Sequence, residues 1–262
     1  TTGRQSCADP NLQNIANPDN GNVRYVIPAR ECFVAPNDYV LLLVDYSGIE
    51  LRLIVDACGE QEMIDTLNAG GDIHGLGAET IYERADYSYA ERAGCKTLGF
   101  SYPYGGSDEA AAKDLVNIDK KEIPPALRRY KKRFPKLVNF NATVIDEARD
   151  NGYITTAFGR KITVTKGKAY TGANYKIQGT AAGILKRAQN RLHEYCRTNF
   201  EPGLLQPVVP VHDEIVMKMH RSLLIDKDHI LTEMSELMCY HPEISVRLDV
   251  EWDMSTTSWA KK

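Results

Sequence analysis

The sequence predicts an α+β fold in which strands come from both ends of the chain and helices fill its middle. Tyr39–Val44 is an uninterrupted apolar run, and Ile215–Met219 is apolar except for Lys218, so both are typical of strands. Between them, residues 60–150 carry apolar side chains mostly at helical spacing, with Gly-Gly and Pro-Pro pairs as breaks. Of the 262 residues, 43% are hydrophobic, so the chain can bury a substantial core.

Composition excludes some classes of protein and leaves others open. The formal net charge of −3 does not predict nucleic-acid binding, so any such role must come from local patches. No apolar run approaches the ~20 residues that cross a bilayer, and nothing at the N-terminus of this sequence has the pattern of a signal peptide. The six cysteines lie far apart, which favours reduced thiols over a disulfide or zinc framework. We therefore expect a cytoplasmic protein with no membrane partner. Because the chain opens without methionine, we expect it to be part of a longer polypeptide.

The first third of the chain predicts a loop region, a strand and a helix. Turn signals such as Asn17-Pro18 and Asn20-Gly21 predict loops and short strands over residues 1–38. The apolar strand that follows ends at Asp45. Ser47-Gly-Ile-Glu50 then has the form of a capping box at the start of a helix.

The last part of the chain returns to strands after a helical middle. In order, we expect a β excursion over 153–165, an amphipathic helix from Gly179 to Arg197, a hairpin of Val208–Val211 with Ile215–Met219, a helix from Ile225 to Met238, and an alternating strand through Val246, Leu248, Val250 and Trp252. The bend of the hairpin carries His212-Asp213-Glu214.

Two carboxylates, Asp45 and Asp213, stand where apolar strands end. An unpaired carboxylate beside a core costs several kcal/mol, so these positions require an explanation. A turn-capping aspartate explains either one taken alone. If the two strands are neighbours, the carboxylates converge and suit Mg²⁺, which takes one or two carboxylates together with waters and substrate phosphates. Two such ions ~3.5–4 Å apart clamp the attacking and leaving oxygens of a phosphoryl displacement.

Four residues spaced four apart form a second pattern, made of Arg92, Lys96, Phe100 and Tyr104. This spacing places two cations and two aromatic rings on one stripe of a helix. Such a stripe can bind a triphosphate and stack on a base or a sugar. A solvated basic patch beside an aromatic core stripe gives the same pattern, and the spacing alone leaves both interpretations open.

Three segments strongly resemble motifs A, B and C of the family A DNA polymerases, in the right order. They are Asp45-Tyr-Ser-Gly-Ile-Glu-Leu-Arg52, Arg92-x3-Lys96-x3-Phe100-x3-Tyr104-Gly105 and Val211-His-Asp-Glu-Ile215. Flanking segments also resemble the family, namely Thr2-Gly-Arg4 with Pro10-Asn-Leu-Gln-Asn14 (primer strand), Gly71-Asp-Ile-His74 (start of the fingers), Gly152–Arg160 (fingers signature) and Asn174–Ala182 (template-side helix). The resemblance covers essentially the whole chain.

The resemblance implies a right-hand architecture with a palm of antiparallel sheet. The palm is expected over residues 1–56 and 175–262, and the helical fingers over 57–174. The implied function is DNA-directed extension of a primer 3′-OH with deoxynucleoside triphosphates, through two Mg²⁺ ions, for which Mn²⁺ can substitute. The implied partners are primer–template DNA, the nucleotides, and a thumb and exonuclease portion in the same polypeptide or in another chain. The implied setting is a bacterial or virus-infected bacterial cell, or an organelle, in replication or repair.

The resemblance also assigns roles to single residues. Asp45 and Asp213 would hold the metal ions with the backbone carbonyl of Tyr46, and Glu214 would serve as a secondary catalytic carboxylate. Arg92, Lys96 and His74 would bind the triphosphate, and Lys96 would protonate the leaving pyrophosphate. Phe100 would pack on the nucleotide, and Tyr104 would stack in the template path. Glu50, with Tyr104, would exclude a ribose 2′-OH. Primer and template contacts would come from Arg4, Asn11, Gln13, Asn174, Gln178 and His212.

The sequence departs from the family at a few positions, and more than one function stays open. Gly48 replaces the usual glutamine of motif A, and Gly99 replaces a larger polar residue. Pro103 should end or kink the motif B helix just before Tyr104. A single-subunit RNA polymerase shares the three motifs, although Glu50 is expected of a deoxynucleotide selector. Reverse transcription also stays open, as does a non-catalytic nucleic-acid-binding remnant, although the retained Asp45 and Asp213 argue against the remnant.

Overall fold

The computed structural model describes residues 2–9, 11–15 and 29–260. The chain divides into two compact units, and each draws on separated parts of the sequence. The sheet unit comprises Gly3–Ile49, Ala181–His241 and Leu248–Lys262. The helical unit comprises Thr1–Thr2, Glu50–Thr180 and Pro242–Arg247, where the sequence predicted fingers over 57–174.

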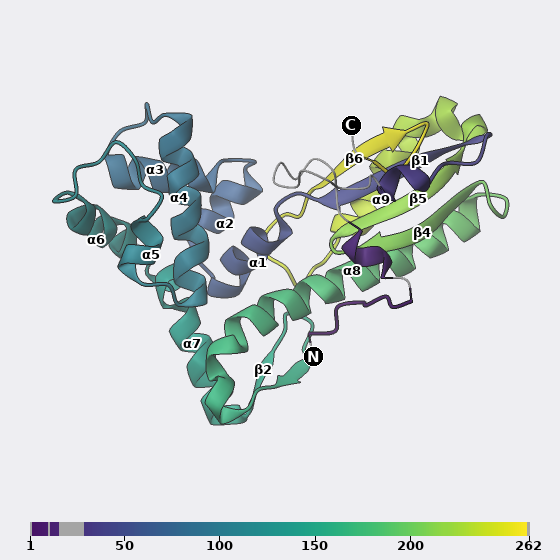
Figure 1. Ribbon diagram of the computed structural model, residues 1–262. Coiled ribbons are helices and arrows are strands. Elements are labelled where there is room, and N and C mark those ends of the chain that lie inside the picture. The colour runs from purple at the N-terminus through teal and green to yellow at the C-terminus, as the bar shows by residue number, and fades with distance from the viewer. Residues whose placement is uncertain (1, 10, 16–28, 261–262) are drawn as a thin grey trace. The chain divides into compact units, whose positions relative to one another are not determined.

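The sheet unit is built on an antiparallel sheet with the strand order β4-β5-β1-β6 (Figure 1). Its strands are β1 Tyr39–Tyr46, β4 Leu205–Val211, β5 Glu214–His220 and β6 Val250–Ser255. β1 lies between two neighbours and is buried along most of its length, which explains its continuous apolar run. The α+β prediction and the sheet formed from both ends of the chain are confirmed.

The last strand was predicted too early. Val246 and Leu248 are buried but precede β6, which starts at Val250. The reason is the partner strand, since Tyr46, the last residue of β1, pairs with Val250. Residues before Val250 therefore have no β1 backbone to pair with.

One face of the sheet carries a buried cluster of Leu41, Leu43, Val211, Val216 and Trp259. Side chains alternate between the two faces of a strand. The other face of β1 presents Val40, Leu42 and Val44, each with 0% exposure. The alternation assigns Asp45 to the same face as Leu41 and Leu43, and Glu214 to the same face as Val216.

Two long helices contribute to the sheet unit. α9 spans Lys227–Cys239 and buries Ile230, Met234 and Met238, which are spaced four residues apart. It follows a 3-10 segment over Arg221–Asp226, so the helix begins two residues later than Ile225. α8 spans Gly172–Asn199 and belongs to both units. It begins at Gly172 rather than Gly179 because its first turn is packed, with Ala173 at 1% exposure.

The helical unit contains seven short helices and one small hairpin within the described residues. They are α1 Ile49–Cys58, α2 Gln61–Asn68, α3 Ile73–Tyr82, α4 Tyr89–Ser101, α5 Asp108–Ala112, α6 Ile123–Arg133, α7 Pro135–Asn151, and the pair β2 Tyr153–Thr155 with β3 Lys161–Thr163. The hairpin confirms the β excursion. The Pro-Pro pair at 124–125 starts α6 instead of breaking a helix, because proline is tolerated in a first turn.

The effect predicted for Pro103 is confirmed. α4 ends at Ser101, and a 3-10 turn over Tyr102–Tyr104 follows it. Tyr104 therefore lies beyond the α-helix that carries Arg92, Lys96 and Phe100.

The N-terminal part contributes little regular structure where it is described. It has 3-10 turns at Leu12–Asn14 and Ala29–Cys32 and a bridge between Val34 and Ser258. The turn signals at Asn17-Pro18 and Asn20-Gly21 lie outside the described residues. No helix in the described part of the chain has the length and apolar character needed to span a membrane.

Candidate active site

Asp45 lies near the end of β1, and Asp213 lies in the turn that leads into β5, the strand paired with β1. Asp45 pairs with Glu214 in the register of β1 and β5. Val211 also pairs with Glu214, so β4 and β5 are joined by the two-residue turn His212-Asp213. Asp213 therefore immediately precedes Glu214, the residue that pairs with Asp45. Asp45 is half-buried and Asp213 is exposed, so both border the solvent at this end of the sheet.

The donor atoms at this end of the sheet suit a hard cation. Carboxylate oxygens from Asp45 and Asp213 and the backbone carbonyl of Tyr46 are the ligands that Mg²⁺ and Mn²⁺ prefer. Within the described residues, no group of three or more His, Cys, Asp or Glu side chains forms a complete metal cage. Two carboxylates without a full cage fit a cation that keeps several waters and binds substrate phosphates.

Tyr46 can serve this site only through its backbone. Its side chain is buried, and its hydroxyl donates to the carbonyl oxygen of Met238 at 2.9 Å. Burial, together with the nearby Cys239, raises the pKa of this hydroxyl well above its ordinary value. The phenol is therefore a neutral anchor between β1 and the end of α9.

Glu214 points into the protein. Its side chain is 6% exposed, and its Oε1 accepts a hydrogen bond of 2.8 Å from the indole Nε1 of Trp259. The Nη1 of Arg30 lies 3.8 Å from the same oxygen. The carboxylate that was expected to be catalytic is thus held within the buried cluster on this face of the sheet.

α4 carries the predicted cationic stripe in the helical unit. Its N-terminus is fixed by a capping box, in which Ser88 and Glu91 bond each other's backbone N–H groups. Glu91, Cys95 and Leu98 are buried, and they hold one side of the helix against the unit. Lys96 is exposed, while Arg92 and Phe100 are partly exposed.

Asp72 binds Arg92 through two hydrogen bonds, from Nε at 2.5 Å and from Nη2 at 2.9 Å. Asp72 is also the N-cap of α3, where it accepts from the N–H of His74 at 3.0 Å. Burial raises the pKa of this carboxyl, but the bonds from Arg92 and from backbone N–H groups outweigh it, so the pKa lies below its ordinary value. An ionised Asp72 therefore fixes one edge of the Arg92 guanidinium.

His74 is close enough to both cations of α4 to feel their charge. Burial first, and then the charges of Arg92 and Lys96, lower the pKa of His74 to about 4. At neutral pH its imidazole is uncharged. A contact between His74 and phosphate would therefore be a hydrogen bond and not an ion pair.

Glu50 and Tyr104 meet directly. The Tyr104 hydroxyl donates to Glu50 Oε1 at 2.5 Å, which links the first turn of α1 to the 3-10 turn after α4. Ser47, the other member of the predicted capping box, donates its hydroxyl to Glu251 at 2.8 Å. The short Glu50–Tyr104 bond places the two residues of the predicted sugar selector side by side.

An open cavity of about 410 Å³ borders the cationic stripe. Its lining includes Lys96, Thr97, Phe100, Ser101 and Lys113. Lys113 was not singled out from the sequence because it stands outside the four-residue spacing of the stripe. The cavity offers two cations, an aromatic ring and two hydroxyls within one unit.

The predicted primer and template residues are divided between the units. Asn174 and Gln178 lie one turn apart on α8 in the helical unit, and both are partly exposed. The others lie in the sheet unit, namely Arg4, Asn11, Gln13 and His212. Asn11 caps the turn that contains Gln13 by accepting from its N–H at 3.2 Å. His212 is exposed and has a φ of +57°.

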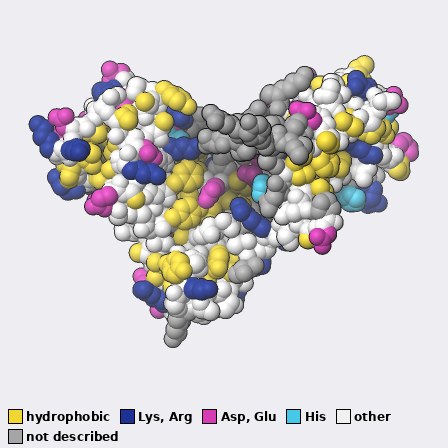
Figure 2. All heavy atoms as spheres, viewed as in Figure 1, with side chains coloured by type: hydrophobic (Ala, Val, Ile, Leu, Met, Phe, Trp, Pro, Cys, Tyr) yellow, Lys and Arg dark blue, Asp and Glu magenta, His cyan; other side chains and the backbone are white. Residues whose placement is uncertain are grey.

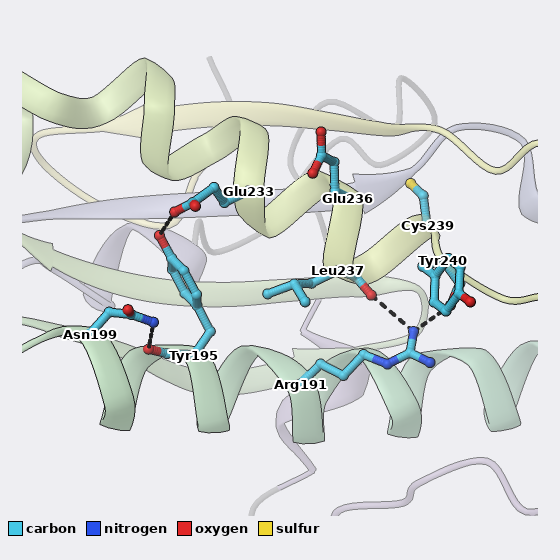
Figure 3. Close-up of a pocket in the computed structure, with 8 residues that line it drawn as sticks. All are labelled: Arg191, Tyr195, Asn199, Glu233, Glu236, Leu237, Cys239 and Tyr240. Atoms are coloured by element: carbon cyan, nitrogen blue, oxygen red, sulfur yellow. Dashed lines mark hydrogen bonds between the residues drawn. The ribbon is translucent and has the colours of Figure 1, made fainter.

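A larger cavity, of about 720 Å³, lies between α8 and α9 and contains none of the predicted residues (Figure 3). Arg191 spans it and donates to the carbonyl oxygens of Leu237 and Tyr240, which caps the end of α9. Tyr195 donates to Glu233 at 2.6 Å. The polar groups that line this cavity thus mainly join α8 to α9.

Three residues that matter to the site's geometry were missed, namely Asp72, Arg30 and Trp259. Asp72 stood inside the Gly71-Asp-Ile-His74 motif, and its N-cap position was a usable signal. Arg30 and Trp259 carried no local pattern. Their proximity to Glu214 depends on the packing of segments far apart in the sequence.

The antiparallel sheet with aspartates at adjacent strand ends, together with a helical unit that carries a cationic stripe, defines the class of right-hand nucleic-acid polymerase folds. Residues 1–261 match the sequence model of DNA polymerase family A. The chain therefore belongs to DNA polymerase family A.

Several DNA polymerases are similar to this chain in sequence. DNA polymerase I of Streptococcus pneumoniae is 34% identical over 90% of this chain and 28% of its own length. DNA polymerase I of Pseudomonas aeruginosa is 31% identical over 85% of the chain and 25% of its own length. The DNA polymerase of Mycobacterium phage D29 is 30% identical over 72% of the chain. The chain thus spans between a quarter and a third of the length of these relatives.

A solved structure is similar over nearly the whole chain. It is described as the POL domain of Pol1 from M. smegmatis in complex with DNA primer–template and dNTP. It covers 99% of this chain and 46% of its own, with a TM-score of 0.79 and 26% identity.

Proposed function

We propose that this chain is the palm and fingers portion of a DNA-directed DNA polymerase that extends a primer 3′-OH with deoxynucleoside triphosphates. The observation that carries the proposal is the pairing of β1 with β5, which brings the strand ends of Asp45 and Asp213 together. The sheet unit is the palm and the helical unit is the fingers. The relatives named DNA polymerase I, and a neighbour bound to primer–template and dNTP, support this function.

Asp45 and Asp213, with the Tyr46 carbonyl, would hold two Mg²⁺ or Mn²⁺ ions. When bound, such ions lower the pKa of the attacking 3′-OH and stabilise the charge on the leaving pyrophosphate. Asp213 is exposed and Asp45 is half-buried at this end of the strands, so substrate oxygens can complete the coordination.

The residues of α4 would bind the nucleotide. Arg92, oriented by Asp72, and Lys96 would neutralise the triphosphate, and Lys96 would donate a proton to pyrophosphate. The neutral His74 would contribute a hydrogen bond to phosphate. Phe100 would pack on the sugar and base. Tyr104 would stack near the nascent pair, and its bond to Glu50 would close the space that a 2′-OH requires.

Primer–template DNA would contact both units. Arg4, Asn11, Gln13 and His212 would contact it from the palm, and Asn174 and Gln178 from α8. A thumb and exonuclease portion would come from the same polypeptide or another chain. Because the named relatives are bacterial or phage proteins, we place the activity in the cytoplasm of a bacterial or phage-infected cell.

Replacement of single carboxylates tests the proposal. Asp45→Asn or Asp213→Asn should lower the rate of primer extension by about 10³-fold or more, because each removes a metal ligand that acts on the transition state. Folding should be retained, since both side chains reach solvent. The matched control is Asp228→Asn, an exposed acid on α9 of the same unit, which should extend like the parent. Extension within tenfold of the parent for either site variant would contradict the two-metal assignment.

A further inference from the structure

Three segments far apart in the sequence converge on Glu214. The indole Nε1 of Trp259 donates to its Oε1 at 2.8 Å, and Arg30 Nη1 lies 3.8 Å from that oxygen. The Arg30 guanidinium also lies over the Trp259 ring, 4.4 Å from its centroid. Arg30, Glu214 and Trp259 are 8%, 6% and 1% exposed. The three side chains therefore form one buried polar cluster beside the turn that carries Asp213.

The C-terminal segment that supplies Trp259 is fixed by its own contacts. The N–H of Trp259 donates to the carbonyl of Phe33 at 2.9 Å, and Ala35 donates to Thr257 at 3.2 Å. The rings of Phe33 and Trp259 meet edge to face with centroids 5.5 Å apart. The indole is thus held by a backbone ladder and by ring packing, independently of its bond to Glu214.

The environment of Glu214 disfavours metal binding by its Oε1. This oxygen already accepts the indole N–H and lies beside a guanidinium, so a divalent cation there would meet two positive neighbours. A buried carboxylate costs several kcal/mol unless it is paired. The cluster offsets that cost when the carboxylate points towards Trp259 and Arg30, which favours this direction of the Glu214 side chain.

The turn next to Glu214 needs such support. His212 has a φ of +57°, in the left-handed region that residues other than glycine rarely adopt. Two-residue hairpin turns usually place glycine, asparagine or aspartate where φ is positive. A strained conformation of this kind persists when the surrounding structure determines it. Glu214 is the first residue of β5 after this turn, so its anchoring limits where Asp213 can lie.

We propose that Glu214 is a positioning residue, and that Trp259 and Arg30 hold its carboxylate so that the His212-Asp213 turn presents Asp213 to the metal ions. This inference rests on the proposed function. It assigns the C-terminal segment a part in metal binding and gives Glu214 no direct contact with metal.

Mn²⁺ binding to the free protein, measured by electron paramagnetic resonance, tests the inference without substrate. Trp259→Phe keeps a ring against Phe33 and removes the N–H donor, so it should weaken Mn²⁺ binding about 3- to 10-fold. The lost bond and the smaller ring should lower the urea unfolding midpoint, but the variant should remain folded under the conditions of the binding measurement. Glu214→Gln keeps an acceptor for the indole, and should weaken binding by no more than about twofold. Trp252→Phe is the matched control, because its indole also donates one bond, to Ser235 at 2.8 Å, elsewhere in the same unit. It should bind Mn²⁺ like the parent.

The outcomes separate this inference from the proposed function. If Asp213→Asn abolishes Mn²⁺ binding and Trp259→Phe leaves it unchanged, only the positioning role is wrong. Loss of binding in Glu214→Gln as complete as in Asp213→Asn would make Glu214 a metal ligand and also overturn the inference. If Asp213→Asn binds Mn²⁺ like the parent, the metal site and the inference both fail.

A second measurement leaves the cluster intact. The chain has two tryptophans, so Trp252→Phe makes Trp259 the single emitter. Mg²⁺ titration of this variant should change the Trp259 emission, and the same titration of Trp252→Phe with Asp213→Asn should not. Identical emission with and without saturating Mg²⁺ in the first variant would contradict the coupling of Trp259 to the metal site.

Discussion

At the scale of single residues, the cations of α4 have neighbours that the spacing of these cations in the sequence did not predict. Arg92 carries an ionised partner in Asp72, and His74 remains neutral between two cations. A bidentate carboxylate holds a guanidinium in one plane, which limits the entropy lost when phosphate binds. The face of α4 that we propose binds the nucleotide is therefore partly ordered in the free protein.

The neutral state of His74 makes stability depend on pH. Its pKa in the folded protein is about 4, below the ordinary value of about 6.5 in the unfolded chain. Between these values the unfolded state binds more protons, so the free energy of unfolding rises with pH. The contribution is fully present above pH ~6.5 and is lost as pH falls towards 4. We expect His74→Gln to remove on the order of 2 kcal/mol of the stability lost between pH 7 and pH 4.5.

Urea unfolding of parent and variant at both pH values measures this difference. An equal loss in His74→Gln would mean that His74 titrates normally in the folded protein.

At the scale of elements, the structure joins α1 to the turn after α4 through one short hydrogen bond. Glu50 lies in the first turn of α1, and Tyr104 ends the 3-10 turn that contains Pro103. Proline limits φ in this turn and ends the helix before Tyr104. The position of the Tyr104 ring therefore depends on the end of α4 as well as on Glu50.

Sugar selection tests this link. Glu50→Ala should raise the use of ribonucleotides relative to deoxynucleotides by about 10- to 100-fold, because it removes the group that denies space to the 2′-OH. Tyr104→Phe removes only the hydroxyl that bonds Glu50, so we expect a smaller change in the same direction. Single-nucleotide incorporation kinetics with matched pairs of dNTP and rNTP measure both. An unchanged ratio in Glu50→Ala would mean that Glu50 only caps α1. A parent chain that prefers ribonucleotides would instead favour an RNA polymerase.

Local patterns predicted those elements whose cause is local. The apolar run of β1, the turn at Asp213 and the helix break at Pro103 each depend on a few adjacent residues, and all three are present. The start of β6 was missed because it depends on where β1 ends, and the early start of α8 depends on packing. The burial of Glu214 depends on Arg30 and Trp259, which no pattern of local spacing connects to it.

At the scale of the whole molecule, α6 carries a cluster of five cations that are mostly paired within the helical unit, namely Arg128, Arg129, Lys131, Lys132 and Arg133. Arg129 donates to the carbonyl oxygens of Thr80 and Ile81 at the end of α3. Lys131 pairs with Asp108 at 2.5 Å, and Arg133 pairs with Glu62 at 2.5 Å. Figure 2 shows the Lys and Arg side chains over these helices interspersed with Asp and Glu. Of the cluster's cations, Arg128 and Lys132 are exposed and make no ion pair within the described residues.

This pairing predicts weak binding of duplex DNA by a protein made of these 262 residues alone. Each phosphate contact contributes about −0.9 to the slope of log affinity against log salt. With net charge −3 and with Arg129, Lys131 and Arg133 of α6 already paired, we expect a slope no steeper than about −3, and extension that stops after one or a few additions. Fluorescence anisotropy of a labelled primer–template at several salt concentrations measures the slope, and a heparin trap measures the length made in one encounter.

Two pairs of variants determine whether α6 itself holds DNA. If it does, Arg128→Gln and Lys132→Gln each flatten the slope by about 0.9, whereas Arg129→Gln and Arg133→Gln lower the unfolding midpoint and leave the slope unchanged. We expect none of these four variants to flatten the slope, because the phosphate contacts with duplex DNA would come from a thumb outside these residues. Fusing the chain to that portion of a relative should steepen the slope and lengthen the products. Long products from the unfused chain under the trap, shortened by Arg128→Gln with Lys132→Gln, would instead show that α6 holds the duplex.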